Sequence, residues 1–242
     1  MQRFHERIRA KAANPWEPPV LIVAFGDSVT QGMTTLDEQL HDDVYHARFR
    51  RLLEAQYPLC TFSVINAGVS GQTACGALSL LERDVIRHQP DLTLVAFGLN
   101  DAWNGENGVG DYVAALTAIV ERIVRETTSD VVLLTPNFMN TAPPAHVQGD
   151  ERRGFEMSAA IQNTGVLASY AQAVRDLAHR RGVPCVDVYA EWSASASRGI
   201  DTDAWLANHM NHPTREAHAI PANLLIALVR GSAPTGGPPR TT

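Results

Sequence analysis

Residues 20–32 read VLIVAFGDSVTQG, in which six apolar residues lead into a polar turn that begins at Gly26 and ends at Gly32. A short run rich in Val, Ile, Leu and Phe, flanked by turn residues, is typical of a buried strand that is covered on both faces. Further runs of this kind follow at residues 62–65, 92–97, 131–134 and 183–188. The sequence therefore predicts five buried strands.

Segments with the apolar spacing of helices separate these strands. They cover residues 44–57, 74–88, 113–127 and 166–181. A last helix is expected from about residue 214 to 230, because Pro213 suits a helix start, with a kink or break at Pro221 inside it. Since strands and helices alternate, we expect an α/β fold, a three-layer α/β/α sandwich around a five-stranded parallel sheet.

The length of 242 residues suits one domain with a large core, which we expect at residues 20–230. Residues 1–19 predict an N-terminal arm or a short helix, and residues 231–242, rich in Gly and Pro, predict a disordered tail. No apolar stretch reaches the ~18 residues of a membrane span, and the N-terminus lacks the apolar segment of a secretory signal. We therefore expect a cytoplasmic protein without a transmembrane segment.

Charge and cysteine content argue against several classes of partner. A formal net charge of -6 gives no electrostatic basis for binding nucleic acid. The three cysteines are widely spaced and form no C-x-x-C pair, so neither a disulfide framework nor a cysteine metal site is expected. The spacing of His209, His212 and His218 matches no metal motif. We therefore expect no metal and no cofactor, while the sequence leaves the oligomeric state open.

Three polar loops follow the first three predicted strands. They are GDSVTQG at residues 26–32, NAGVSG at residues 66–71 and GLND at residues 98–101. In a parallel α/β sheet the carboxyl ends of the strands share one edge, and sites form there. We therefore expect the three loops to meet and to build a functional site.

Ser28 lies in the first of these loops, where a strand turns into a helix. A serine hydroxyl is a poor nucleophile that needs a base to take its proton. Attack on an ester creates a tetrahedral oxyanion, which preorganised donors must meet. The backbone N–H groups of Ser28 and Gly71 and the side-chain amide of Asn100 could supply them from three strand ends. A helix cap at Ser28 or Asp27 is the alternative interpretation of the first loop.

Histidine is the usual base for such a serine, and the chain has nine. His212 immediately precedes Pro213 and follows the fifth predicted strand, so it can lie in a loop on the same sheet edge. His218 falls inside the expected last helix, where packing or surface exposure is favoured. His212 is therefore the candidate base.

With these residues assembled, the sequence resembles the SGNH hydrolase superfamily, also called GDSL esterases and lipases, over about residues 20–230. Residues 26–32 are similar to the first block of the family, residues 66–73 to the second, residues 98–101 to the third, and His212-Pro213 to the block that supplies the base. The resemblance implies a flavodoxin-like sandwich that hydrolyses an acyl ester without a cofactor. It also implies that Gly71 and Asn100 belong to the oxyanion hole.

One position departs from the family pattern. The family usually has an aspartate three residues before its histidine, and this chain has His209 there. A backbone carbonyl could hold the His212 ring and leave a Ser–His dyad, an upstream carboxylate could reach the ring, or catalysis could be weak. We favour the dyad, because some relatives similarly lack a carboxylate there. The upstream carboxylates are Asp203 and Asp201, and the neighbours that could also orient the ring or simply shape its loop are Asn208 and Asn211.

The segments over this sheet edge should choose the substrate. Residues 137–164 are long and irregular, which is typical of a lid or binding element, and a disordered insertion is the alternative. Trp103 and Asp27 are possible substrate contacts. With no long apolar surface stretch, we expect small acyl groups, such as acetyl on a carbohydrate or another polar small molecule. A binding protein without catalysis and an acyltransferase that uses the same acyl-enzyme are the alternative functions.

Overall fold

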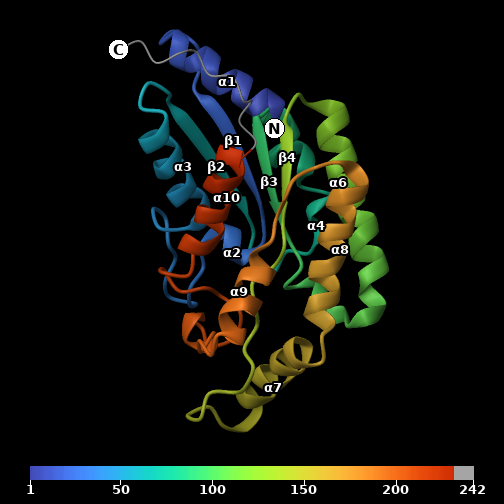
Figure 1. Ribbon diagram of the computed structural model, residues 1–242. Helices are drawn as coiled ribbons and strands as arrows, with labels where there is room; N and C mark the ends of the chain where they lie inside the picture. Colours follow the sequence, from blue (N-terminus) through green and yellow to red (C-terminus); the bar gives the residue numbers. More distant parts are fainter. Residues whose placement is uncertain (232–242) are drawn as a thin grey trace.

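The computed structural model of the chain describes residues 1–231, and a five-stranded parallel sheet runs through this part. The strand order is β2-β1-β3-β4-β5, and every neighbouring pair is parallel. Figure 1 shows helices on both faces of the sheet. The strands are β1 (Val20–Gly26), β2 (Phe62–Gly68), β3 (Leu92–Ala96), β4 (Asp130–Leu134) and β5 (Cys185–Val186). The predicted α/β/α sandwich is therefore confirmed.

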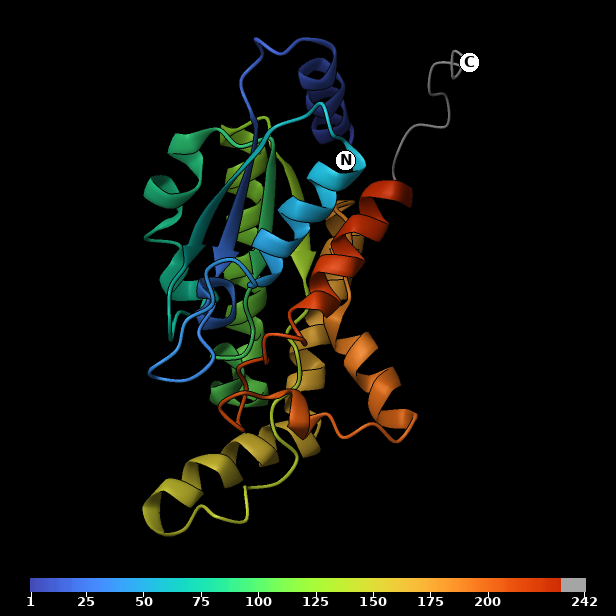
Figure 2. The same cartoon turned by 90° about the vertical axis from the view of Figure 1, so that its left-hand side faces the viewer.

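Alternation along the strands divides the core into two layers. In β1, Val23 and Phe25 pack into one layer and Val20 and Ile22 into the other, because successive strand side chains point to opposite faces. The first layer contains α4 (Ala74–Ala77), α5 (Leu81–Asp84), α6 (Val109–Glu126) and α8 (Val166–Arg181). The second contains α1 (Gln2–Ala13), α3 (Tyr45–Gln56), α9 (Val188–Ser197) and α10 (Ala219–Gly231). Figure 2 shows α3 and α10 side by side in this second layer.

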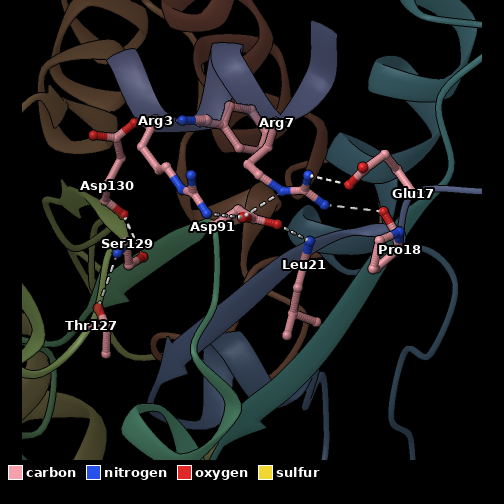
Figure 3. A network of polar contacts seen from close by, with 10 residues as sticks. Arg3, Arg7, Glu17, Pro18, Leu21, Asp91, Thr127, Ser129 and Asp130 are labelled. Atoms are coloured by element: carbon pink, nitrogen blue, oxygen red, sulfur yellow. Dashed lines mark hydrogen bonds and ion pairs between the residues drawn. The ribbon is translucent and has the colours of Figure 1, made fainter. Parts of the chain in front are cut away.

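Helix α1 closes the amino-terminal end of the sheet. Phe4 is fully buried, and its N–H donates to the Asp130 carboxylate at the start of β4 (2.8 Å). Arg7 donates to Asp91 (3.1 Å), whose other oxygen accepts the N–H of Leu21 in β1 (2.9 Å; Figure 3). The helical part of the expected arm therefore contributes its inner face to the core.

The last helix begins later than the sequence predicts. Helix α10 starts at Ala219, and residues 215–218 form turns. Pro221 has no N–H to donate to the carbonyl four residues earlier, so the expected helix breaks just before it. Within α10, Pro221 lies in the first turn, where no N–H is needed. Of the predicted tail, only Gly231 is described, as the end of α10, and residues 232–242 lie outside the described residues.

The sequence led us to expect residues 137–164 to be irregular, but part of this segment is helical. Helix α7 (Gly149–Asn163) lies within them, and Figures 1 and 2 show it beyond the carboxyl ends of the strands. Gly154 interrupts the segment, so propensity gives only a weak helix signal there. The residues that α7 buries follow the i, i+3, i+4, i+7 spacing of a helix face, but two of them are polar. They are Phe155, Ser158, Ala159 and Gln162.

Two other predicted elements are shorter than expected. Strand β5 has two residues, because Pro184 before it has no N–H for the ladder and Asp187 after it already caps α9. The helix predicted at residues 74–88 is divided into α4, α5 and the 3-10 helix η1 (Ile86–His88), and Gly76 lowers helix propensity in its first part. Within residues 1–231, no helix is long and apolar enough to cross a membrane.

Candidate active site

The three polar loops begin side by side at the carboxyl edge of the sheet. Gly26, at the end of β1, pairs with Gly68 at the end of β2 and with Ala96 at the end of β3. A Cβ on Gly68 would lie 2.1 Å from the backbone nitrogen of Gln31, so only glycine fits there. This close approach brings the second loop against the short helix α2 (Ser28–Gln31), which begins with the candidate nucleophile.

Asp27 fixes the turn that presents Ser28. Its carboxylate accepts the N–H of Val29 (2.9 Å) and thereby caps α2. As the first residue of the helix, Ser28 has an N–H without a partner inside the helix, which is a donor that a ligand can use. Only 3% of Asp27 is exposed. The structure therefore gives Asp27 a capping role in the interior, and the substrate contact considered from the sequence stays a prediction.

The ring of His212 lies between Ser28 and Thr34, which belong to the same segment after β1. Its Nε2 is 2.9 Å from Ser28 Oγ, and its Nδ1 is 3.2 Å from the backbone oxygen of Thr34. Because a carbonyl oxygen can only accept, Nδ1 carries the proton and donates to Thr34, and Nε2 is left as an acceptor for the Ser28 hydroxyl. Burial lowers the pKa of His212 below 6.5, and the hydrogen bond to Thr34 opposes this shift. The ring is therefore mainly neutral at pH 7, the form that can take a proton.

Asp203, the acid considered from the sequence, is bound to residues other than His212. Its carboxylate accepts the N–H and the hydroxyl of Thr141 (2.9 Å each) and the N–H of Ala142 (3.3 Å). Asp201 accepts the N–H of Asp203 (3.0 Å). Neither carboxylate is a partner of the His212 ring in the described part of the chain. The expectation for Asp203 is corrected accordingly, because its oxygens satisfy backbone donors of a neighbouring loop while a carbonyl holds the ring.

The segment that leads into α7 is attached to the loop of His212. The N–H of Asn140 donates to the carbonyl of Met210 (2.7 Å). The ring of His209, at the position of the family's aspartate, makes an edge contact with the ring of His146 (centroids 5.7 Å apart). Together with the bonds of Asp203, these contacts join the start of the 137–164 segment to the candidate site. A disordered insertion, one of the two expectations for this segment, is therefore wrong.

Gly71 and Asn100, the other predicted oxyanion donors, lie in loops that are bonded to each other. Asn100 Nδ2 donates one hydrogen to the carbonyl of Gln72 (3.0 Å), and its second hydrogen is not needed for that bond. Gly71 has a φ of 74°, in the left-handed region that favours glycine. A Cβ on Gly71 would meet no other atom within 4 Å, so its backbone borders open space.

Two buried carboxyl groups lie behind these loops. Asp101 accepts the N–H of Ala74 (2.9 Å), and its other oxygen is buried without a partner among the described residues. Burial raises the pKa of Asp101 to about 6. Burial also raises the pKa of Asp27 to about 7, with a smaller contribution from the charge of Asp101. Near neutral pH the Asp27 carboxyl is therefore divided between its neutral and its ionised form.

The sequence did not reveal the residues that support the site from behind. Thr34 acts through its backbone oxygen, for which no side-chain pattern gives a signal. Tyr45 OH lies 3.1 Å from the hydroxyl of Thr30, and His218 Nδ1 accepts the N–H of Tyr45 (3.3 Å). His218 is fully buried, so of the two positions considered from the sequence, packing and surface, it takes the packing position. Through Tyr45 in α3, these contacts connect α2 to His218, directly before α10.

A serine hydroxyl in contact with a neutral histidine, at the carboxyl edge of a parallel sheet, is the arrangement of serine hydrolases. Comparison with known proteins gives the particular family. The model of the GDSL-like lipase/acylhydrolase family matches residues 24–220. An acetylxylan esterase of Geobacillus stearothermophilus is 25% identical over 185 residues, which cover 72% of this chain and 75% of that protein. The chain belongs to the GDSL-like lipase/acylhydrolase family, and it is a carboxylic ester hydrolase.

Solved structures share the fold. The crystal structure of the acetylxylan esterase from Geobacillus stearothermophilus has a TM-score of 0.65 at 22% identity, covering 86% of this chain and 92% of that chain. The lipase/acylhydrolase from Enterococcus faecalis has a TM-score of 0.67 at 22% identity, covering 90% of this chain and 99% of that chain. The sandwich observed here is therefore that of known acyl ester hydrolases.

Proposed function

We propose that this protein hydrolyses short acyl esters through an acyl-enzyme on Ser28, with His212 as general base in a Ser–His dyad. One observation carries the proposal: the His212 ring contacts Ser28 Oγ through Nε2 (2.9 Å) while Thr34 holds Nδ1 (3.2 Å). The carbonyl fixes the tautomer and the orientation of the ring, which are two of the services that a triad aspartate provides. It adds no negative charge for the imidazolium that forms.

In the first half-reaction, Ser28 Oγ attacks the carbonyl carbon of the ester while His212 Nε2 takes the hydroxyl proton. The carbonyl oxygen becomes an oxyanion, for which the N–H groups of Ser28 and Gly71 and the amide of Asn100 are the donors we assign. When the tetrahedral intermediate collapses, the bond to the leaving oxygen breaks. His212 returns its proton to that oxygen, the alcohol departs, and the acyl group remains on Ser28.

In the second half-reaction, water replaces the alcohol. His212 Nε2 takes one proton from the water as its oxygen attacks the acyl carbon, and the same donors meet the new oxyanion. Collapse of this intermediate breaks the bond to Ser28 Oγ, which regains a proton from His212. The products are the free acid and the starting enzyme, so no cofactor is needed for the balance.

For the substrate, we propose acetyl or another short acyl group on a carbohydrate or similar polar carrier. An acetylxylan esterase is a relative over most of the chain, which favours this class. Trp103, in the 3-10 helix η2 (Asp101–Asn104) directly after Asn100, is 38% exposed. An exposed indole three residues after a proposed oxyanion donor offers an apolar face with a polar edge, which suits a sugar ring. We assign the hydrolase domain to residues 20–230, a span that contains the family match.

The test combines active-site labelling with a series of esters. A fluorophosphonate probe is expected to label Ser28, and Ser28→Ala is expected to abolish labelling and to lower kcat/KM for p-nitrophenyl acetate by at least about 10³-fold. Ser193→Ala, which changes an exposed serine of α9, is the matched control and should leave both unchanged. Among p-nitrophenyl acetate, butyrate and octanoate, the acetate is expected to have the highest kcat/KM, by at least about tenfold over octanoate.

Each part of the proposal has its own contrary result. Full activity in Ser28→Ala would exclude Ser28 as nucleophile. A preference for octanoate with the same labelling pattern would retain the nucleophile and exclude the short-chain assignment. Labelling of Ser28 without turnover of any ester, acetylated xylooligosaccharides included, would favour a binding protein on this fold. Transfer of the acyl group to an added alcohol in preference to water would instead favour an acyltransferase.

A further inference from the structure

The loop that carries His212, residues 207–212, is closed at its base. Leu206 and Pro213 form an antiparallel bridge, and the N–H of Ala207 donates to the carbonyl of His212 (2.7 Å). Both ends of the loop therefore lie side by side, and the His212 backbone stands at the point of closure. The conformation inside the loop then decides where the His212 Cα and Cβ point.

Inside this loop, one side chain accepts three of the backbone N–H groups. Oδ1 of Asn208 accepts the N–H groups of Met210 (3.1 Å), Asn211 (2.9 Å) and His212 (2.9 Å). The Nδ2 of Asn208 donates to Oδ1 of Asn211 (3.1 Å), which fixes the orientation of the carboxamide. A single carboxamide oxygen thus gathers the N–H groups of three residues, the last of which is His212.

The loop needs such an acceptor, because its backbone is strained. His209 has a φ of 56°, in the left-handed region that costs a residue with a side chain about 1–2 kcal/mol. Two carbonyls of the loop accept hydrogen bonds from outside it. The N–H of Asn140 donates to the carbonyl of Met210 (2.7 Å), and Nδ2 of Asn137 donates to the carbonyl of Asn211 (3.0 Å). The neighbouring segment therefore satisfies two carbonyls of the loop, while Asn208 satisfies three of its N–H groups.

We propose that Asn208 is a positioning residue for the base: it sets the backbone of His212 so that the ring spans Ser28 Oγ and the Thr34 carbonyl. The inference rests on the proposed Ser–His dyad. In a triad, a charged acceptor behind the ring helps to hold it, and a bond to such a group is about twice as strong as one between neutral groups. Here the acceptor is a neutral carbonyl at 3.2 Å. The orientation of the ring therefore depends more on its backbone, and thus on Asn208.

The test is a graded series at residue 208. Asn208→Asp keeps an acceptor that reaches all three N–H groups, Asn208→Ser keeps a shorter one, and Asn208→Ala keeps none. The kcat for p-nitrophenyl acetate is expected to be highest in Asn208→Asp, lower in Asn208→Ser and lowest in Asn208→Ala. We expect Asn208→Ala to lie about 10- to 100-fold below the wild type, as for a misplaced catalytic group. KM should change little. The acid midpoint of kcat/KM against pH should stay in place in Asn208→Ala, because a neutral carboxamide adds no charge.

Asn223→Ala, which removes an exposed carboxamide from α10, is the matched control and should retain wild-type kcat. Circular dichroism melts give the folded fraction at the assay temperature. A flat kcat series, or a loss that only follows the unfolded fraction, would overturn the inference. Should Asn208→Ala not fold, the comparison of Asp with Ser decides, and equal kcat values contradict the role. Failure of the dyad itself is distinguishable, because it would appear as full activity in Ser28→Ala or as a loss in Asp203→Asn as deep as that in His212→Ala, whatever residue 208 does.

Discussion

At the scale of single residues, Asp27 illustrates how the support of the candidate nucleophile conflicts with stability. Its carboxylate caps α2 from a buried position, and burial raises its pKa from 3.8 to about 7. A folded pKa above the unfolded one means that the folded state binds the extra proton. Stability is therefore favoured at low pH and falls as the pH rises from about 4 to about 7. Above that window, the folded protein holds a buried carboxylate with few partners.

Asn is as good a helix cap as Asp but does not ionise. We therefore predict that Asp27→Asn gains stability relative to the wild type as the pH rises, by roughly 2–4 kcal/mol between pH 4 and pH 8. Urea unfolding of both proteins at the two pH values measures this difference. An equal difference between the two proteins at pH 4 and pH 8 would show that Asp27 has an ordinary pKa in the folded state.

The predictable site residues are those whose chemistry lies in a side chain or a glycine within a motif. Ser28, Gly71, Asn100 and His212 could be named from the sequence, and the structure brings His212 to Ser28 and the loop of Asn100 to that of Gly71. Thr34 could not be named, because it offers a backbone oxygen that every residue type has. Its proximity to His212 follows only from the folded path of the chain.

At the scale of elements, the two ends of the sheet have different tasks. Helix α1 packs on the amino ends of the strands, whereas α2 and the candidate site lie at the carboxyl ends (Figure 1). The strands could be predicted because each contains a short apolar run next to turn residues. Helix α7 could not, because its buried face includes Ser158 and Gln162, which an apolar pattern does not count. The start of α10 depends on Pro221. The sequence predicted a kink or break at this proline, but it did not predict that the helix begins only at Ala219, with Pro221 in its first turn.

This division of tasks predicts that the core under α1 can be weakened without changing catalysis. Phe4→Ala removes a fully buried ring and should lower the free energy of unfolding by about 3–5 kcal/mol. The kcat/KM of the folded enzyme should stay unchanged, because Phe4 is at the opposite end from Ser28. Leu59→Ala, at a residue that is 75% exposed, is the control and should change stability by less than about 0.5 kcal/mol. An equally stable Phe4→Ala protein, or one with a large loss of kcat/KM while folded, would contradict this division.

At the scale of the whole molecule, the site is assembled from segments that are far apart in the sequence. His212 and Thr34 are 178 residues apart, and Asn100 and Gln72 are 28 apart. Alternation of strands and helices predicts a parallel sheet, and a parallel sheet predicts that the loops meet at one edge. Which carboxylate reaches which histidine does not follow from that rule. It depends on the path of residues 198–213, where Asp203 turns to Thr141 and leaves the His212 ring to a carbonyl.

The most direct test of the dyad is the kcat/KM for p-nitrophenyl acetate of Asp203→Asn, measured beside His212→Ala. Loss of the base is expected to lower kcat/KM by at least about 10³-fold. Asp203→Asn keeps an oxygen for the N–H of Thr141 and should remain within about tenfold of the wild type, whereas a triad acid changed in the same way loses about 10⁴-fold in kcat. A fall in Asp203→Asn as deep as that in His212→Ala would contradict the dyad and return Asp203 to the role of acid.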